Sequence, residues 1–310
     1  MTTNTTNTSC DKSVSRKDFL RLMFLGGAAA AATPLLPGTA SAAPRIELHK
    51  DTLAVLIDLS RCIGCRSCEA ACNEANHLGN HPAEYESDKV FDEIRRTDAT
   101  HFTVVNKRIP AEGAAPVFVK NQCMHCSEPA CVSACPARAF EKNINGAVTY
   151  NPDVCIGCRY CMQACTFAMP AYEYDSAFDP RVRKCEMCFH NIDKQGAPAC
   201  ASICPQDAIV FGRREVLIEE ARKRLEKDAG YVKHIFGEKE LGGTSVLYIS
   251  RVPFDQIGFP TNLPLEPMPK ATYGFLSTIP VLHITLPVLL AGIYSVTRRR
   301  DDARAEDDHE

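Results

Sequence analysis

Cys123-Met-His-Cys126 opens the segment that decides the fold, which continues with Cys131, Cys135-Pro136, Cys155-Ile-Gly-Cys158-Arg-Tyr-Cys161 and Cys165. The segment holds two runs of four cysteines, and in each run the fourth cysteine follows the third after three other residues. The same kind of run occurs once before it and once after it, the later run being more widely spaced. The outer runs are Cys62, Cys65, Cys68 and Cys72, and Cys185, Cys188, Cys200 and Cys204. Of the 17 cysteines, only Cys10 lies outside the four runs.

This spacing predicts iron–sulfur sites of the ferredoxin type. Three closely spaced cysteines hold most of one 4Fe–4S cluster, and the fourth reaches across to a second cluster. The prolines after Cys135 and Cys204 are a further mark of such runs. Sixteen thiolates are enough for four 4Fe–4S clusters, so all sixteen are predicted iron ligands.

Two other uses of the cysteines fit less well. A zinc-binding structural scaffold is the remote alternative, because structural zinc typically takes two Cys-x-x-Cys pairs. The three-plus-one spacing of the first and third runs suits a single tetrahedral ion poorly. Disulfides would close many small, strained loops.

The rest of the composition excludes several functions. The formal net charge of −3 is not that of a nucleic-acid-binding protein. No flavin or pterin motif is present, and Gly242-Gly243 is too short for a nucleotide-binding loop. We therefore expect an electron-transfer subunit rather than an enzyme. A self-contained reductase is the rival hypothesis, and turnover without any partner subunit would support it.

The first 42 residues have the layout of an export signal. Ser15-Arg16-Lys17-Asp18-Phe19-Leu20 precedes an apolar stretch, and Ala40-Ser41-Ala42 is a small-x-small cleavage site. The signal resembles a twin-arginine leader, although Lys17 stands where the second arginine is usual. An ordinary Sec signal or an amphipathic anchor is the alternative. The twin-arginine route suits the cargo, because it carries folded proteins and unfolded thiols would form disulfides in an oxidising periplasm.

Hydrophobic patterns and turn residues predict a mixed α and β structure. Asn145-Gly146 between β-prone residues indicates a hairpin between the second and third runs. A helix is expected over residues 215–228, with Gly230 as its C-cap. Strands are expected over residues 53–59, 102–109, 208–212 and 245–250, with an extended Pro-rich stretch over 252–270.

One segment near the C-terminus is predicted to cross a membrane. Residues 271–297 contain no Asp, Glu, Lys or Arg, and about 20 apolar residues suffice for a transmembrane helix. Pro280 and Pro287 are expected to kink it. By the positive-inside rule, Arg298-Arg299-Arg300 face the cytoplasm, which leaves the cysteine runs outside. The acidic residues that follow are expected to be a solvated tail.

The four runs in this order, the split fourth run, the leader and the single span together resemble one family. It is that of four-cluster 4Fe–4S electron-transfer subunits of membrane-bound respiratory oxidoreductases. The resemblance is greatest to the HybA-type subunit of hydrogenase-2 and the formate dehydrogenase β subunit. It extends to the later stretches 234–238, 242–248 and 252–254. The resemblance implies an α+β fold of duplicated bacterial-ferredoxin-like modules with a C-terminal transmembrane helix.

The resemblance also implies a function. Electrons would pass one at a time through four 4Fe–4S clusters, from a periplasmic catalytic subunit to a membrane quinone-reducing subunit. A hydrogenase is the expected catalytic partner, and a molybdopterin formate dehydrogenase is the alternative. The expected location is the periplasmic side of the inner membrane, where a single C-terminal helix anchors the protein.

The pairing of the runs rests on the crossing rule and on the family. The hairpin joins the second and third runs into one module, but linker length alone also allows the third run to pair with the fourth. The family pattern pairs the outer runs. The expected ligands are Cys62, Cys65, Cys68 and Cys204 (cluster A); Cys72, Cys185, Cys188 and Cys200 (cluster B); Cys123, Cys126, Cys131 and Cys165 (cluster C); and Cys135, Cys155, Cys158 and Cys161 (cluster D).

The expected domains follow this pairing. The first- and fourth-run module comprises residues 43–122 and 180–215, and the second- and third-run module residues 116–179. A helix and extended segment (216–270), the transmembrane helix (271–297) and a cytoplasmic tail (298–310) complete the chain. Within the cysteine loops, Gly64 and Gly157 are expected where backbone approaches sulfide closely. Arg66, Arg159 and Lys184 are expected either to raise cluster potentials or to be solvated surface cations.

Overall fold

The computed structural model describes residues 52–80, 82–190, 192 and 196–307. The predicted leader, with Cys10, lies outside the described residues. The chain divides into two units, one ending at Gly274 and one that contains the residues from Phe275 onward. They are described separately.

A three-stranded sheet is the centre of the first unit. Strand β1 (Leu53–Asp58) lies between β8 (Ile209–Arg213), which is antiparallel to it, and β9 (Val246–Ile249), which is parallel. The strands predicted over 53–59, 208–212 and 245–250 are thereby confirmed. Since β1 leads into the first cysteine run and β8 follows the fourth, their pairing brings the two outer runs together.

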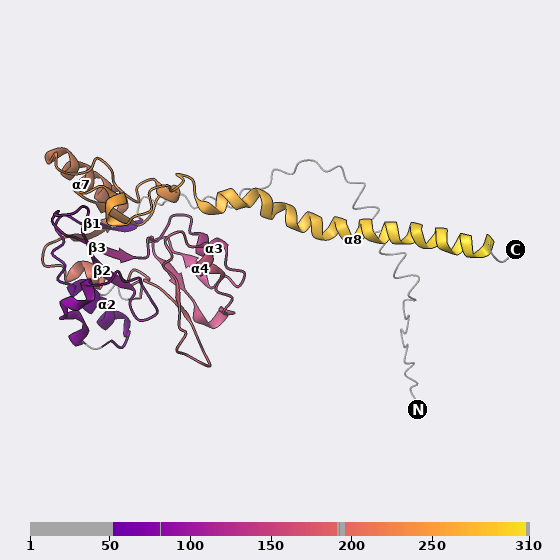
Figure 1. The fold of residues 1–310 in the computed structure, drawn as a ribbon, viewed down its shortest axis with the longest axis horizontal. Coiled ribbons are helices and arrows are strands. Elements are labelled where there is room, and N and C mark those ends of the chain that lie inside the picture. The colour runs from indigo at the N-terminus through magenta and orange to yellow at the C-terminus, as the bar shows by residue number, and fades with distance from the viewer. Residues whose placement is uncertain (1–51, 81, 191, 193–195, 308–310) are drawn as a thin grey trace, which may run out of the picture. The chain divides into compact units, whose positions relative to one another are not determined.

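Both faces of this sheet are buried. On one face, helix α7 (Arg214–Lys227) packs Leu217, Ala221 and Leu225 against the sheet. Figure 1 shows α7 next to β1. The opposite face contacts an aromatic cluster that includes Phe236 and Phe254. The helix was predicted correctly, but its end was not. Asp228, in an extended conformation, is the C-cap, and Gly230 instead donates its N–H to the Asp228 side chain at 2.9 Å.

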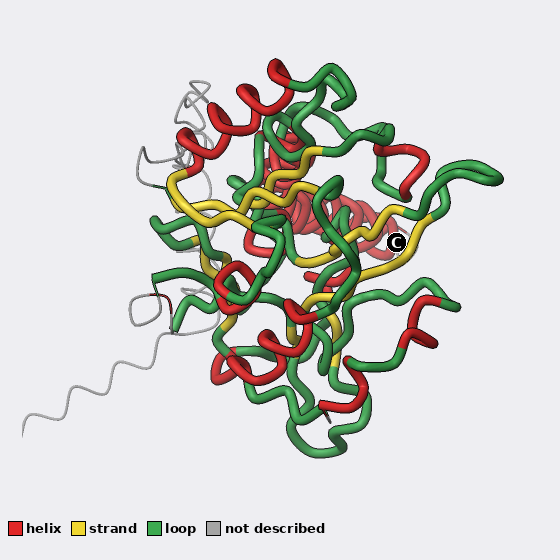
Figure 2. Tube along the Cα trace, turned by 90° about the vertical axis from the view of Figure 1, so that its left-hand side faces the viewer, coloured by secondary structure: helices red, strands yellow, loops and turns green. Residues whose placement is uncertain are grey.

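The other strands among the described residues form three hairpins. Strand β2 (Thr103–Arg108) pairs with β3 (Val117–Gln122), β4 (Phe140–Lys142) with β5 (Val148–Tyr150), and β6 (Ala171–Tyr172) with β7 (Val182–Arg183). The strand predicted over 102–109 and the hairpin at Asn145-Gly146 are confirmed. Gly146 has a φ of +94°, and a Cβ there would lie 2.4 Å from the Leu53 carbonyl oxygen. The strands are short, and loops make up much of the unit (Figure 2).

In the described part of the chain, four short helices carry cysteines, and they pack in pairs. They are α2 (Ser67–Asn76), α3 (Ala130–Ser133), α4 (Tyr160–Ala164) and α6 (Ala199–Ser202). Helix α2 packs against α6, and α3 packs against α4, as Figure 1 shows for the second pair. The helices of the first and fourth runs are therefore neighbours, as are those of the second and third runs.

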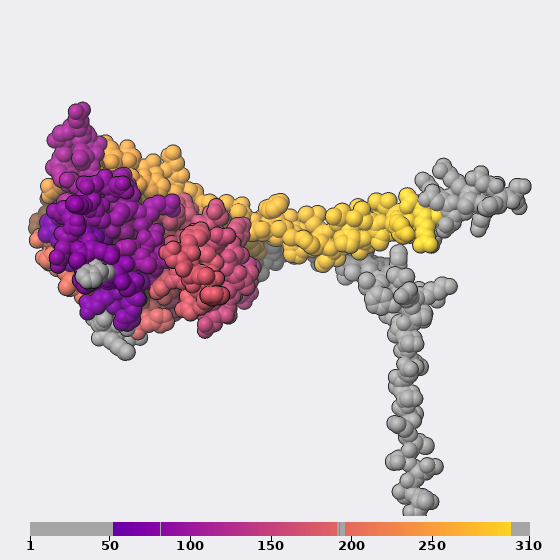
Figure 3. Space-filling model, turned by 60° about the horizontal axis from the view of Figure 1, so that its bottom comes forward, coloured from indigo at the N-terminus to yellow at the C-terminus, as the bar shows by residue number. Residues whose placement is uncertain are grey.

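The part that holds the first and fourth runs contacts the part that holds the second and third runs. Thr97 Oγ1 donates to the Met169 carbonyl at 3.4 Å, and Arg96 Nη2 donates to the Ala168 carbonyl at 3.4 Å. In the space-filling view, the indigo first-run region and the magenta-to-rose region of the second and third runs lie side by side (Figure 3). The cysteine runs thus form one continuous body.

Single helical turns complete the first unit. They are η1 (Pro82–Tyr85), η2 (Asp88–Phe91), η3 (Pro152–Val154), η4 (Glu240–Gly242) and η5 (Phe254–Ile257). The stretch 252–270 was predicted to be extended throughout, and η5 shows that this was wrong. Phe254 and Ile257 are buried in the aromatic cluster, and the turn brings both side chains inward.

Helix α8 (Met268–Asp307) contains the predicted span. Its part from Met268 to Arg298, which contains an 18-residue window with a mean hydropathy of 1.9, is long and apolar enough to cross a membrane. The helix continues through Pro280 and Pro287 without a break. It also continues past the three arginines to Asp307, so the first residues of the predicted tail are helical.

Candidate metal centres

The sixteen cysteines of the four runs are all free thiols. One cavity is lined by all four cysteines expected for cluster A, and another by all four expected for cluster C. The first contains Cys62, Cys65, Cys68 and Cys204, and the second contains Cys123, Cys126, Cys131 and Cys165.

In the other two sets, the thiols lie close enough for their charges to interact. Burial raises the pKa of Cys161 to about 11, and the charges of Cys135, Cys155 and Cys158 contribute to the rise. Burial likewise raises the pKa of Cys72, with contributions from cysteines 185, 200 and 188. These are the members expected for clusters D and B. The structure thus brings the cysteines of sets A and C to one cavity each, and places thiols of sets B and D within electrostatic range of one another.

Neighbouring sets approach one another in a fixed order. Burial raises the pKa of Cys68, and Cys200 of set B raises it further. Burial raises the pKa of Cys185 to about 12, with the next contribution from Cys123 of set C. Burial raises the pKa of Cys131 to about 12, and Cys161 of set D is among the charges that add to it. These electrostatic neighbours indicate the order A, B, C, D.

The donor atoms of the four sets suit a 4Fe–4S cluster. Within the described ranges, no three His, Cys, Asp or Glu side chains are grouped so that they could hold one metal ion. Four thiolates surrounding a cavity nevertheless form the donor set of a 4Fe–4S cluster. The residues present thus fit the predicted cofactor.

A repeated backbone feature shapes all four runs. The residue just before the second cysteine has a positive φ in each: Gly64 (+75°), His125 (+48°), Gly157 (+67°) and Met187 (+59°). In two of these runs, the N–H of this residue donates to the sulfur of the first cysteine. Gly157 N–H donates to Cys155 Sγ at 3.5 Å, and Met187 N–H donates to Cys185 Sγ at 3.4 Å. Such bonds stabilise thiolate and influence cluster potential.

Gly64 and Gly157 are therefore favoured first of all by the positive φ of the turn. At Gly64 there is a second constraint, because an added Cβ would lie 2.4 Å from the Phe118 ring. At Gly157 the nearest atom to such a Cβ is the Tyr172 hydroxyl at 3.7 Å, so φ alone favours glycine there. His125 and Met187 adopt the same region at some conformational cost.

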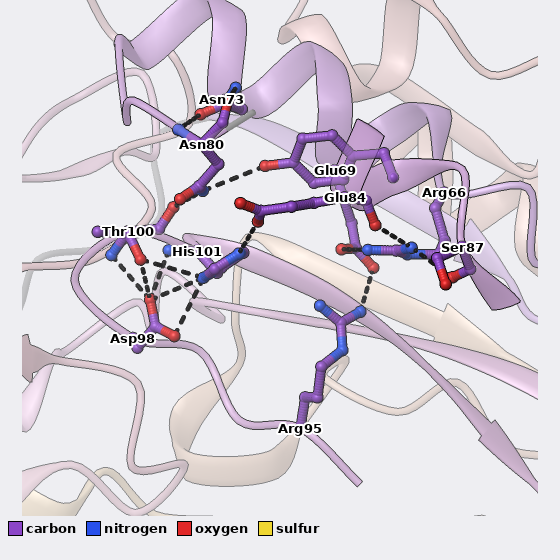
Figure 4. A network of polar contacts seen from close by, with 11 residues as sticks. Arg66, Glu69, Asn73, Asn80, Glu84, Ser87, Arg95, Asp98, Thr100 and His101 are labelled. Carbon is purple, nitrogen blue, oxygen red and sulfur yellow. Dashed lines mark hydrogen bonds and ion pairs between the residues drawn. The ribbon is translucent and has the colours of Figure 1, made fainter. Parts of the chain in front are cut away.

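A buried ionic network holds α2 in place (Figure 4). Glu69, between Cys68 and Cys72, accepts hydrogen bonds from Arg95 Nη2 at 2.7 Å, Arg66 Nη2 at 3.2 Å and the Val105 N–H at 2.6 Å. Arg66 also donates to the Glu84 carbonyl at 2.8 Å. The network fixes α2, which carries the cysteines, to β2 and to the segment that precedes β2.

Comparison with known proteins agrees with this site. A 4Fe-4S dicluster domain family matches residues 114–214, and a 4Fe-4S binding domain family matches residues 53–74. The chain is 32% identical over 333 residues to the Hydrogenase-2 operon protein HybA of Escherichia coli O157:H7, covering 96% of this chain and 100% of that protein. The chain belongs to this family of 4Fe–4S electron-transfer subunits.

Two other relatives extend the comparison. The iron–sulfur subunit of the nitrate-inducible formate dehydrogenase of Escherichia coli K12 is 33% identical over 250 residues, covering 74% of this chain and 83% of that subunit. A protein of Nitratidesulfovibrio vulgaris is 44% identical over 300 residues, covering 96% of this chain and 80% of the relative.

The cations predicted for this 4Fe–4S subunit have different surroundings. Arg66 and Lys184 are buried, so the solvated-cation alternative is wrong for both. Arg66 belongs to the Glu69 network, and Lys184 donates to the Cys185 carbonyl at 3.1 Å. Arg159 is exposed and lies over the Tyr172 ring at 5.1 Å.

A role for Lys120 was not predicted from the sequence. It lies in the strand leading to Cys123, is 1% exposed, and lines the cavity of set A. Burial alone would lower the pKa of Lys120, but the negative charges of Cys200 and Cys68 hold it above its ordinary value. A lone lysine in the otherwise apolar stretch Val117-Phe-Val-Lys was the available signal.

The contribution of the segment after α7 was also missed. The Gly243 carbonyl accepts the Ser127 N–H at 3.0 Å and the Ser127 hydroxyl at 2.9 Å. The N–H of Ser245 bonds the carbonyls of Met124 and His125. These bonds fix the second run from a distance of more than a hundred residues, and they give Gly242-Gly243 a structural role.

Proposed function

We propose that this chain relays electrons between a catalytic subunit and a membrane quinone-reducing subunit, and that it catalyses no reaction of its own. The observation that carries the proposal is the exposure of the thiols along the order A to D. Of the sixteen cysteines in the described residues, only Cys65 of set A and Cys158 of set D are exposed. A relay needs access at its two ends and insulation between them.

The proposed ligands are the four sets A to D as defined above, giving four 4Fe–4S clusters. The pairwise packing of α2 with α6 and of α3 with α4 supports them. The pairing of β1 with β8 supports a module of residues 43–122 and 180–215 beside a module of residues 116–179. The sequence pattern gives residues 216–270 no function of their own. We propose that these residues hold the second run in position.

A bound 4Fe–4S cluster supplies one-electron exchange. The chain supplies the rest. Its backbone N–H groups donate to cysteine sulfur, as Ala139 does to Cys135 Sγ at 3.2 Å and Met169 to Cys165 Sγ at 3.5 Å. Apolar residues such as Phe140 and Val148 pack around the thiols and exclude water. Burial and hydrogen bonding together set the potentials.

We base the proposed direction of transfer on the position of the start of α8. Met268, its first residue, lines the cavity of set C, next to set D. The D end is therefore proposed to face the membrane partner and the A end the catalytic partner. The leader and the arginines after the span support a periplasmic location, with one C-terminal helix as anchor. The full-length match to HybA favours a hydrogenase as donor, and the match to formate dehydrogenase subunits keeps a molybdopterin enzyme as the second candidate.

Apolar side chains beside the exposed thiols offer a direct test. Ile63 is 54% exposed next to the first run's Cys62, and Ile156 is 68% exposed next to Cys155. Ile63→Glu in the native complex should abolish reduction of the clusters by the donor's substrate. Ile156→Glu should leave that reduction intact and abolish quinone reduction. Ile144→Glu, 74% exposed on the β4–β5 loop, is the matched control.

The outcomes separate the parts of the proposal. If Ile156→Glu abolished reduction by the donor and Ile63→Glu abolished only quinone reduction, the direction of transfer would be the reverse of the one proposed. Normal quinone reduction in both variants would contradict the assignment of the two ends. Hydrogen or formate as the effective substrate would identify the donor.

A further inference from the structure

Among the described residues, Lys120 is the most deeply buried cation near the cysteines. It lies in β3 opposite Val105 of β2, and its side chain is turned into the protein. Its Nζ donates hydrogen bonds to Thr103 Oγ1 at 2.7 Å and to Gln122 Oε1. Its carbonyl accepts the Tyr248 hydroxyl at 2.9 Å. Position and direction of the side chain are therefore fixed.

Lys120 has neutral hydrogen-bond partners only. Among the ion pairs formed by the described residues, none joins a carboxylate to Lys120. The acidic groups that interact with it are thiols of two neighbouring sets, Cys68 in A and Cys200 and Cys185 in B, together with Tyr248. It also lines the cavity that contains all four cysteines of set A. A buried charge without a partner is costly, so its compensation must come from the cysteine sites.

We propose that Lys120 is a fixed positive charge shared by clusters A and B, which makes both easier to reduce. The inference rests on the proposed ligand sets. Each reduction adds one negative charge to a site, and a buried cation stabilises that state more strongly than a solvated one. Lys120 thus sets the potentials of the donor half of the relay.

The second half has its own buried lysine, which provides a matched control. Lys142 Nζ donates to the carbonyls of His125 at 2.9 Å and Gly146 at 2.6 Å, beside set C. Its interactions with cysteines are with Cys126 and Cys123. We therefore expect replacement of Lys142 to leave the potentials of A and B unchanged. Lys233, which bonds the Leu225 carbonyl, lies away from the runs and is a second control.

The test is a redox titration of the full chain with bound clusters, followed by electron paramagnetic resonance, for Lys120→Met, Lys142→Met and Lys233→Met. Lys120→Met should shift two of the four midpoint potentials to more negative values. The expected change is at least tenfold in the ratio of reduced to oxidised cluster, which is 59 mV for a one-electron couple. Lys142→Met should not move those two midpoints, and Lys233→Met should move none.

Iron content separates this inference from the assignment of the clusters. Full iron content in Lys120→Met with all four midpoints unchanged would overturn the role of Lys120, as would an equal shift of all four. If the unmodified protein itself lacks four clusters, the ligand assignment fails instead. Lys120→Gln, which retains hydrogen-bonding groups toward Thr103 and Gln122, serves the same measurement if the methionine variant loses iron.

Discussion

Glu69 anchors the helix that carries Cys68 and Cys72, and its replacement is expected to release that helix. Its side chain is 1% exposed, and that of Arg66 is 3% exposed. Glu69→Ala leaves Arg66 buried opposite no charge, removes the ion pair with Arg95, and leaves the Val105 N–H without its acceptor. Three interactions are lost at once, and water cannot readily replace them.

The size of the effect follows from this burial. Removing one partner of a buried ion pair costs about 3–5 kcal/mol. An unsatisfied buried N–H costs about 1–3 kcal/mol, but the terms share one site and do not simply add. We expect about 3–5 kcal/mol for Glu69→Ala. Glu69→Gln retains an acceptor for Val105 and should lose about 1.5–3 kcal/mol.

The assay is the rate at which the visible absorbance of the clusters disappears in denaturant under anaerobic conditions. The helix α2 must detach before its cysteines release iron. Most of the lost stabilisation energy should therefore appear as a faster detachment of α2. A loss of 3 kcal/mol corresponds to about a 100-fold faster decay. Glu74→Ala, exposed on the same helix, is the matched control. If Glu69→Ala decayed no faster than Glu74→Ala, the network would not hold the helix.

Three further predictions concern other parts of the chain. Cys204→Ser should perturb the cluster held by the first run and spare the one held by Cys185, Cys188 and Cys200, and spectra showing the reverse would refute the crossed pairing. Gly64→Ala should weaken cluster A because its Cβ would lie 2.4 Å from Phe118; Gly79→Ala, with a similar φ but open space around it, should not, and equal iron loss in both would implicate φ alone. Removal of residues 271–310 should give a soluble, iron-replete protein that its donor reduces but that no longer supports quinone reduction; tight membrane binding without a partner would contradict the anchor.

Local signals accounted for much of the fold. The cysteine spacing indicated the runs, and the apolar strands around them followed from periodicity, because both are properties of neighbouring residues. Helix α7 was recognised from Leu217, Ala221 and Leu225, which indeed face the sheet. Its C-cap was misplaced, because Asp228 ends the helix in an extended conformation and no αL glycine is needed.

Long-range contacts were beyond the sequence pattern. The burial of Arg66 depends on the carboxylate of Glu69 and on carbonyls some twenty residues later. The burial of Lys120 depends on Thr103 across a hairpin and on cysteines from two runs. The bracing of the second run by Gly243 joins residues 116 positions apart. None of these leaves a periodic signal in the sequence.

The central claim is that sixteen cysteines hold four 4Fe–4S clusters. The most direct test is the iron and acid-labile sulfide content of the anaerobically purified full-length protein. The account predicts about sixteen of each per chain, with negligible zinc. A reproducible value near eight, or zinc in place of iron, would contradict it.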